Sequence, residues 1–184
     1  MSWFTQTISA LGFTVPSVIV ETGTYMGHGV ESYIGNFEKI YSIELNETLY
    51  NQALQKFSNF NNVFLIHGDS ADQLSKNDFG SEPVLFYLDA HFCGKFSSGG
   101  CGSESPLVKE IEAISKRMVK GDIVVIDDMR LMGKAEWEGT EGSEMWPRTF
   151  LDWSTLTKDD VINAFKQPRF IHSCTDIDRL IVVI

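Results

Sequence analysis

Acidic side chains stand at the ends of five short apolar runs, and carboxylates at such places can do chemistry. They can accept hydrogen bonds from hydroxyl and amino groups, pair with a cation, remove a proton or bind a hard metal ion. Any one of them is equally well explained as a helix cap or a solvated acid at a strand end. The ordered recurrence of Glu21, Glu44 and Asp69 instead predicts one shared ligand site, and Asp89, Asp127 and Asp128 stand at the next two run ends.

A glycine-rich turn follows the first of these acids. The predicted strand and the helix after it are separated by Glu21-Thr22-Gly23-Thr24-Tyr25-Met26-Gly27-His28-Gly29, where the backbone can approach a ligand closely. The spacing ExGxxxG differs from GxGxxG, which binds the pyrophosphate of nicotinamide and flavin cofactors. An acid at this strand end would repel a pyrophosphate, but it suits the cationic amino and sulfonium groups of S-adenosylmethionine.

The next two acids fit the other parts of such a cofactor. Glu44 ends the second run, 23 positions after Glu21, where a nucleotide-binding βαβ unit places the acid that binds ribose hydroxyls. Asp69 follows the third run and precedes Ser70, at a place where a carboxylate could meet the amino group of adenine. We therefore expect the cofactor to lie across the ends of the first three strands.

The fourth and fifth runs end in LDAH and IDD, and in a parallel sheet these two ends lie side by side. We expect Asp89, Asp127 and Asp128 to converge as ligands of Mg²⁺ or a similar divalent ion. Such an ion would orient a substrate oxygen and lower its pKa, with His91 or Asp89 helping to remove the proton. The alternative is that Asp89 faces the amino group of the cofactor, the aspartate pair caps the next segment and His91 bonds within its loop.

These acids need a parallel sheet to bring them together, and apolar runs alternate with helix-patterned segments as such a sheet requires. The expected strands are Ser17–Glu21, Lys39–Glu44, Val63–His67, Val84–Asp89 and Ile123–Asp127. The expected helices between them are Gly29–Gly35, Asn46–Phe57, Ser70–Leu74 and Ser105–Val119. After a helix at Lys158–Lys166, an antiparallel hairpin is expected from the strands Arg169–Cys174 and Arg179–Ile184. The predicted fold is one α/β domain over residues 1–184, with helices on both faces of a mostly parallel seven-stranded sheet.

In the order of its predicted strands and helices and in the position of these acids, the chain resembles the class I S-adenosylmethionine-dependent methyltransferases over nearly its whole length. The resemblance implies their Rossmann-like fold and their methyl donor. The cofactor-binding residues that it implies are Glu21, Thr22, Gly23, Tyr25 and Gly27 at the methionine end, Glu44 at the ribose, Asp69 and Ser70 near adenine, and Asp89 beside the amino group.

The fourth and fifth strand ends resemble a narrower group, the metal-dependent O-methyltransferases of the macrocin and novobiocic-acid type. In that group, LDxD and DD segments supply three metal-binding aspartates, and the general base is the aspartate two positions after the first ligand. Here that position is occupied by His91. The resemblance therefore implies a metal site at Asp89, Asp127 and Asp128, and a general base that is the imidazole of His91 instead of a carboxylate.

Two loops are expected beside this site. Phe92–Ser105 is rich in Gly and Ser and could close over an acceptor, although a plain surface loop fits equally well. Gly133–Phe150 lacks periodicity and is interpreted as a loop that could serve as a substrate lid. Trp137 and Trp146 could stack on a sugar or an aromatic ring, whereas Trp153 is expected to pack against the C-terminal helix.

The amino-acid composition limits which binding partners and which cellular compartment are expected. A net charge of −10 and a pI near 4.8 disfavour nucleic acid and anionic membranes as partners. No apolar run is long enough to span a membrane, and residues 1–15 lack a secretory signal pattern, so a cytoplasmic protein is expected. Cys93, Cys101 and Cys174 are expected to be free thiols, with a conditional link or a metal cage between the first two as the alternative. Association into a homo-oligomer stays open.

Three functions from different classes follow. The leading one is O-methylation of a hydroxyl on a sugar, a glycan or another small molecule, with a divalent metal ion assisting. The second is an NAD-dependent oxidoreductase, which the ExGxxxG spacing disfavours. The third is an inactive S-adenosylmethionine-binding subunit, because the short N-terminus leaves little room for the substrate-capping helices of the resembled family.

Overall fold

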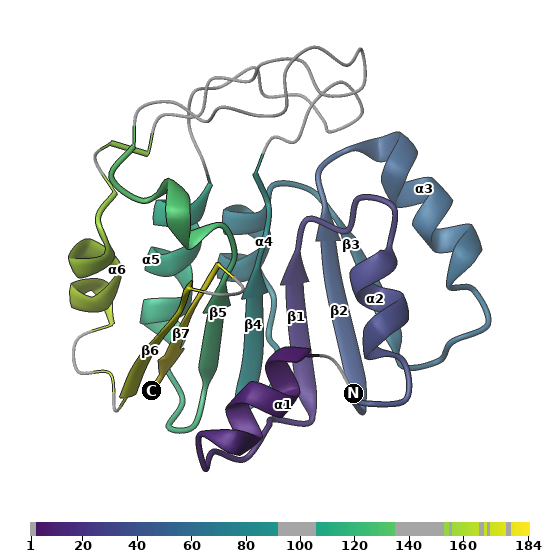
Figure 1. Cartoon of the computed structure of the whole chain (residues 1–184). Helices are drawn as coiled ribbons and strands as arrows, with labels where there is room; N and C mark the ends of the chain where they lie inside the picture. The colour runs from purple at the N-terminus through teal and green to yellow at the C-terminus, as the bar shows by residue number, and fades with distance from the viewer. Residues whose placement is uncertain are drawn as a thin grey trace.

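Strands and helices alternate along the chain in the order that the sequence predicts (Figure 1). The computed structural model describes residues 3–91, 106–134, 153–154, 156–165, 168, 170–175 and 178–184. The strands are β1 (Val18–Thr22), β2 (Lys39–Glu44), β3 (Val63–His67), β4 (Val84–Leu88), β5 (Ile123–Ile126), β6 (Phe170–Cys174) and β7 (Arg179–Val183). The helices are α1 (Trp3–Ala10), α2 (His28–Tyr33), α3 (Glu47–Lys56), α4 (Ser70–Lys76), α5 (Leu107–Arg117) and α6 (Lys158–Ala164), with a 3₁₀ helix η1 at Met129–Leu131.

The strands form one sheet in the order β3-β2-β1-β4-β5-β7-β6. The first five strands of the chain pair in parallel, and β7 runs antiparallel to both β5 and β6. This arrangement confirms the predicted mostly parallel sheet with an antiparallel hairpin at its C-terminal end. It also places β1 and β4 side by side in the middle, with β2 on one side and β5 on the other.

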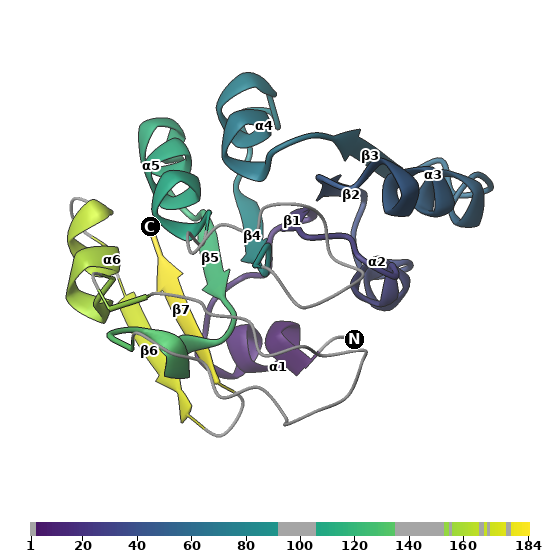
Figure 2. The same ribbon diagram turned by 90° about the horizontal axis from the view of Figure 1, so that it is seen from above.

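Alternating side chains along the strands build a hydrophobic core on each face of the sheet. On one face, Ile19 and Leu85 belong to a cluster with residues of α1, α2 and α3. On the other face, Val20 and Phe86 belong to a cluster with residues of α4, α5 and α6. The view from above shows the two groups of helices on opposite sides of the sheet (Figure 2). Helices therefore cover both faces, as predicted; β1, β4 and β5 are buried between them, while the edge strand β3 is partly exposed.

Side-chain caps fix the start of the helices that follow β2 and β3. The side chain of Asn46 accepts hydrogen bonds from the backbone N–H groups of Thr48 and Leu49, at the start of α3. Asp69 caps α4 in the same way through the N–H of Asp72, over 3.0 Å. These caps satisfy helix-end donors that would otherwise lack partners, and they hold the two loops at the carboxyl edge of the sheet in defined positions.

Element ends differ from the expected ones by two residues at most, and two elements lie outside the predicted set. One is α1, whose Phe4 and Ile8 are one turn apart and both face the core. The other is η1, directly after Asp128. Among the described residues, no helix has the length and apolar character needed to cross a membrane.

Candidate active site

The carboxyl ends of β1 and β4 meet at the centre of the sheet, where the strand order reverses. In open α/β sheets this crevice is the usual place for a ligand. Gly23, directly after β1, has a φ of 85°, and a Cβ there would lie 2.7 Å from the carbonyl oxygen of Asp89. The N–H of Asp89 in turn donates to the hydroxyl of Thr22 over 3.3 Å. The turns after β1 and β4 therefore touch, and the contact requires glycine at position 23.

Glu21 is buried beneath the glycine-rich turn, next to Gly29. Its side chain is 4% exposed, and it accepts hydrogen bonds from the hydroxyls of Tyr33 over 3.0 Å and Ser42 over 2.7 Å. Burial raises the pKa of Glu21 to about 8, against the lowering effect of these two hydrogen bonds. The carboxyl lies between residues of α2 and β2, and its contact with a cofactor stays a prediction. In this structure Glu21 links β1 to α2 and β2.

Glu44 joins the turns that follow β1 and β2. Its carboxyl group accepts from the backbone N–H of Tyr25 and from that of Asn46, each over 2.8 Å. Tyr25 has a φ of 47°, which is uncommon for a residue other than glycine, so this bond helps to hold an unusual turn. A carboxylate has about four lone-pair sites, and two of them are used here. Glu44 can therefore accept further hydrogen bonds from a ligand while it keeps the turn in place.

The remaining predicted cofactor residues occupy three different settings. Asp69 is exposed, and one of its carboxylate oxygens caps α4. Ser70 is buried, and its hydroxyl interacts with the carboxyl of Glu110 on α5. Gly27 is the N-cap residue of α2 and packs against the ring of Phe57. Asp69 is thus the member of this group with a side chain open to a ligand.

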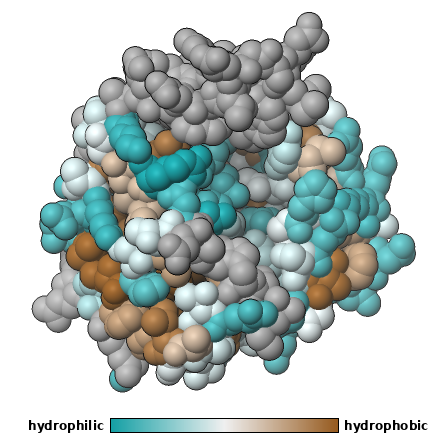
Figure 3. Space-filling model, in the orientation of Figure 1, coloured by the Kyte–Doolittle hydropathy of each residue, from teal (hydrophilic) through white to brown (hydrophobic). Residues whose placement is uncertain are grey.

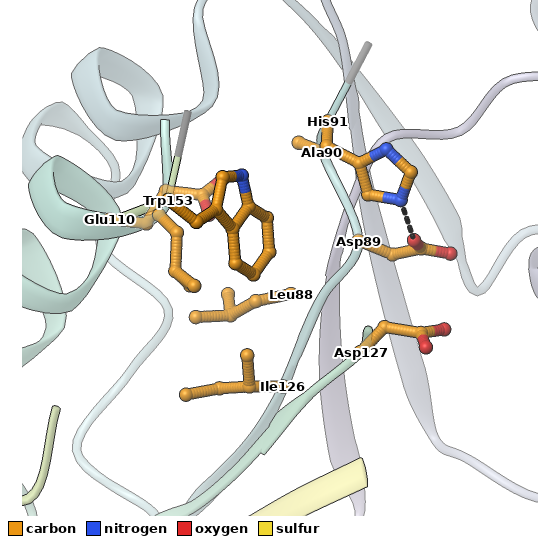
Figure 4. A pocket seen from close by; sticks show the side chains of 9 residues that line it. Leu88, Asp89, Ala90, His91, Glu110, Ile126, Asp127 and Trp153 are labelled. Atoms are coloured by element: carbon orange, nitrogen blue, oxygen red, sulfur yellow. Dashed lines mark ion pairs between the residues drawn. The ribbon is translucent and has the colours of Figure 1, made fainter. Parts of the chain in front are cut away.

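Asp89, His91 and Asp128 form a compact cluster at the ends of β4 and β5. One ligand atom from each lies within 4.8 Å of the other two. Nε2 of His91 is 3.5 Å from Oδ1 of Asp89 and 2.5 Å from Oδ2 of Asp128 (Figure 4 marks the first pair). Burial by itself would lower the pKa of His91, but its hydrogen bonds to the two carboxylates raise that pKa well above the ordinary value. The cluster brings together three predicted site residues.

Asp127 does not join this cluster. Its Oδ2 accepts a hydrogen bond from the hydroxyl of Tyr87 over 2.7 Å, and its Oδ1 lies 2.5 Å from Nη1 of Arg179. Burial and the nearby charge of Asp89 raise the pKa of Asp127 above its ordinary value. This differs from the predicted metal set of Asp89, Asp127 and Asp128, because His91 stands where Asp127 was expected. The physical reason is that Asp127 is committed to an ion pair with β7.

A turn of charged residues supports Asp128. Asp128 adopts a left-handed conformation with φ 56°, and Arg130 pairs with its carboxylate and with that of Asp178, between β6 and β7. The backbone N–H of Arg130 also donates to Asp178 over 2.7 Å. Burial alone would raise the pKa of Asp128, but His91 and Arg130 lower it to about 2. Sequence reasoning missed Arg130, Asp178 and Arg179, because their role depends on a hairpin that is distant in sequence.

A pocket lies next to this cluster, between the ends of β4 and β5 and helix α5 (Figure 4). Asp89, His91 and Asp127 line one side of it, while Glu110 and Trp153 lie on the other. The space-filling view shows hydrophilic side chains gathered at the same end of the molecule, just below the grey atoms (Figure 3). Polar groups thus concentrate where the parallel strands end.

Several predicted features lie outside the described residues. They are the loop Phe92–Ser105, all but the first two residues of Gly133–Phe150, and the side chains of Cys93, Cys101, Trp137 and Trp146. Within the described part, Cys174 is a free thiol in β6. Trp153 is 3% exposed and shares a core cluster with Val161 and Phe165, which confirms its predicted packing with the C-terminal helix.

Comparison with solved structures identifies the architecture. PaMTH1, a Podospora anserina methyltransferase solved with bound SAH, aligns with a TM-score of 0.63 and 15% identity, over 98% of this chain and 76% of its own. A Staphylococcus aureus protein with a proposed caffeoyl-CoA O-methyltransferase activity aligns with a TM-score of 0.60 and 18% identity, over 97% and 79%. The N-methyltransferase NodS from Bradyrhizobium japonicum, with bound SAH, aligns with a TM-score of 0.54 and 11% identity, over 97% and 81%.

The chain has the class I methyltransferase fold. No protein-family model and no curated protein sequence matches it. The structural neighbours include proteins named for transfer to oxygen and to nitrogen, so the class I fold by itself does not select an acceptor atom. The acceptor is determined by the residues of the site.

Proposed function

We propose that this chain is an S-adenosylmethionine-dependent methyltransferase that holds the methyl donor at the carboxyl edge of β1, β2 and β4. The observation that carries the proposal is the setting of Glu44. Its carboxyl group fixes the turns after β1 and β2 through Tyr25 and Asn46, and it keeps lone pairs for two neighbouring hydroxyls of a ribose. Asp69, open at the end of β3, would meet the adenine, and Gly23 would let the methionine end approach the backbone.

The acceptor that fits this site best is a hydroxyl group on a sugar, a glycan or another small molecule. Methyl transfer to a hydroxyl needs a group that orients the oxygen and helps to remove its proton. Asp89 has 38% of its side chain exposed, against 12% for His91 and 13% for Asp128, so it is the member of the cluster most open to an acceptor. We assign the oxygen-facing role to Asp89 on this ground.

Two carboxylates and an imidazole can also form a donor set for a divalent ion: the carboxylate oxygens suit Mg²⁺ or Mn²⁺, and the imidazole, which must lose its proton to bind, suits Mn²⁺ better than Mg²⁺. Their ligand atoms are close enough to share one ion, and Arg130 and Asp178 hold Asp128 in place from the outside. When bound, such an ion would supply Lewis-acid polarisation of the acceptor oxygen. In this assignment His91 acts as a ligand in place of Asp127, and the resemblance to the macrocin and novobiocic-acid type concerns the ends of β4 and β5 only.

The other two candidate functions make different predictions. An NAD-dependent oxidoreductase is disfavoured because β7 lies antiparallel between β5 and β6, unlike the all-parallel dinucleotide folds. An inactive S-adenosylmethionine-binding subunit would bind the cofactor without transferring its methyl group.

Calorimetric titration and a transfer assay test the proposal together. We expect the chain to bind S-adenosylmethionine and adenosylhomocysteine and to give no binding heat with NADH. With methyl-labelled donor and a library of sugars and phenols, we expect label in hydroxyl-bearing products, at a rate that falls when a chelator is added. Binding of NADH alone would overturn the cofactor assignment, and cofactor binding without transfer to any acceptor class would favour the inactive subunit.

A further inference from the structure

The pocket beside the cluster contains two buried polar atoms that lack a hydrogen-bond partner among the described residues. They are Oε1 of Glu110 and Nε1 of Trp153. Glu110 is 1% exposed and Trp153 is 3% exposed, so bulk water does not reach either side chain freely. Buried polar groups are nearly always paired, because an unpaired one loses its hydration without replacement. Two unpaired atoms on one pocket leave a place that an ordered water or a polar group of a ligand would complete.

The walls of this pocket are otherwise apolar on the α5 side. Leu88, Leu107 and Ile126 line it together with Glu110 and Trp153. Glu110 belongs to the face of α5 that also carries the buried Leu107, and the pocket continues to Asp89 and His91 (Figure 4). Its volume is about 10 Å³, which corresponds to roughly one water-sized group. A single polar atom can therefore enter it from the side of the candidate active site.

The two unpaired atoms restrict the chemistry of that group. The indole N–H of Trp153 can only donate, whereas a carboxylate oxygen of Glu110 accepts. A group that accepts from the indole N–H and donates to the carboxylate oxygen must carry a hydroxyl, as an alcohol, a phenol or water does. An ammonium group cannot accept, and an ether, a carboxylate or a phosphate cannot donate. Burial raises the pKa of Glu110 to about 7, and a hydroxyl can also accept from the protonated form.

We propose that Glu110 and Trp153 bind a hydroxyl group of an uncharged acceptor, and so orient that acceptor beside Asp89 and His91. This site rests on the proposed methyltransferase function, because it assigns the pocket to the acceptor side of that reaction. It adds two specificity-determining residues, neither of which lies at a strand end. It also selects hydroxyl-bearing acceptors over amines and acids.

Nuclear magnetic resonance of the indole N–H groups tests this proposal without knowledge of the natural acceptor. Loss of one signal in Trp153→Phe identifies the Trp153 resonance in the native protein. Titration with phenol is expected to shift that resonance and to saturate. Anisole has the same ring and an oxygen that cannot donate, and benzylammonium has a donor that cannot accept. Both are expected to bind at least about tenfold more weakly than phenol, since each leaves one buried partner unpaired.

Variants on α5 provide the matched control. Glu110→Leu removes both carboxyl oxygens and keeps the bulk, so it should weaken phenol binding at least about tenfold. Glu112→Leu changes an exposed position of the same helix and should leave phenol binding unchanged. If Glu110→Leu does not fold, saturation-transfer measurements on phenol with Trp153→Phe give the same comparison. Equal binding of phenol and anisole, or phenol binding that is insensitive to Glu110→Leu, overturns the proposal.

Calorimetry with S-adenosylmethionine on the same samples separates this inference from the proposed function. If the cofactor binds and phenol does not, the hydroxyl site is wrong and the methyltransferase proposal stands. If phenol binds as expected and the cofactor does not, the assignment of the site to a methyl acceptor is wrong. Glu112→Leu should leave cofactor affinity within about threefold of the native protein, whereas Glu110→Leu also removes the hydrogen bonds that Glu110 makes with Ser70 and Thr22, at the ends of the strands that carry the cofactor turns.

Discussion

Asp127 and Asp128 are adjacent in sequence, yet their carboxylates serve different purposes. Asp128 meets His91 and Asp89, whereas Asp127 pairs with Arg179 and accepts a hydrogen bond from Tyr87. Consecutive residues at a strand end point in different directions, so only one of the two can face the cluster. The ion pair with Arg179 on β7 decides which one it is.

Metal binding tests whether Asp128 is a ligand and Asp127 is not. Mn²⁺ is a suitable probe because it accepts carboxylate and imidazole ligands and is visible by electron paramagnetic resonance. His91→Ala and Asp128→Asn should each weaken Mn²⁺ binding by about tenfold or more, because each removes a ligand. Asp127→Asn should change it by about threefold or less, since its carboxylate faces Arg179. An Asp127→Asn effect as large as that of Asp128→Asn would instead support the ligand set expected from the sequence.

The sequence located these residues correctly at the strand ends but did not fix the direction of their side chains. Apolar runs show where a buried strand ends, and therefore which acids lie at its edge. The partner that turns Asp127 away is on β7, and the partners that bury Glu21 are Tyr33 and Ser42. Those contacts arise from tertiary packing, which a local pattern does not contain.

At the scale of elements, the site depends on contact between the turns after β1 and β4. Gly23→Ala tests it, because the added Cβ would lie 2.7 Å from the Asp89 carbonyl oxygen. Gly12→Ala is the matched control, since Gly12 has a similar φ of 84° and no atom within 4 Å of its added Cβ. Urea unfolding should show that Gly23→Ala loses about 1–3 kcal/mol more stability than Gly12→Ala, and only Gly23→Ala should weaken cofactor binding. Equal losses would mean that the close approach is not required.

The strands and most helices could be predicted because their patterns are strong. β1, β4 and β5 are buried on both faces and read as short apolar runs, α3 begins at a side-chain cap, and α5 carries clear helical spacing. Two available signals were not used. Phe4 and Ile8 have the spacing of one helical turn in α1, and Glu110 places an acid among the apolar positions of α5. A polar residue on a predicted core face indicates a functional position.

At the scale of the whole molecule, buried acids on both faces of the sheet make stability depend on pH. The pKa of Glu21 is raised to about 8 and that of Glu110 to about 7, from a value of 4.5 in the unfolded chain. Between pH 5 and 8 the folded state therefore binds more protons than the unfolded state. The free energy of unfolding should fall across this range as pH rises, by an amount on the order of several kcal/mol.

Glu21→Gln should remove the part of the pH dependence of stability that Glu21 causes, since glutamine stays neutral. Glu47→Gln, at an exposed position, should keep the native pH profile. Urea unfolding at pH 5, 6, 7 and 8 provides the comparison. A native profile that is flat or rises over this range would contradict the assigned burial of both acids.

The placement of the methyl donor at Glu44 is tested most directly by calorimetric titration of S-adenosylmethionine into the native chain, Glu44→Ala and Glu38→Ala. Glu44 is the acid that is buried at the crevice and still able to accept ligand hydroxyls, whereas Glu38 is exposed before β2. We predict binding to the native chain, a loss of about 10- to 100-fold in affinity for Glu44→Ala and no change for Glu38→Ala. Unchanged affinity in Glu44→Ala, or no binding to the native chain, would contradict the placement of the methyl donor at Glu44.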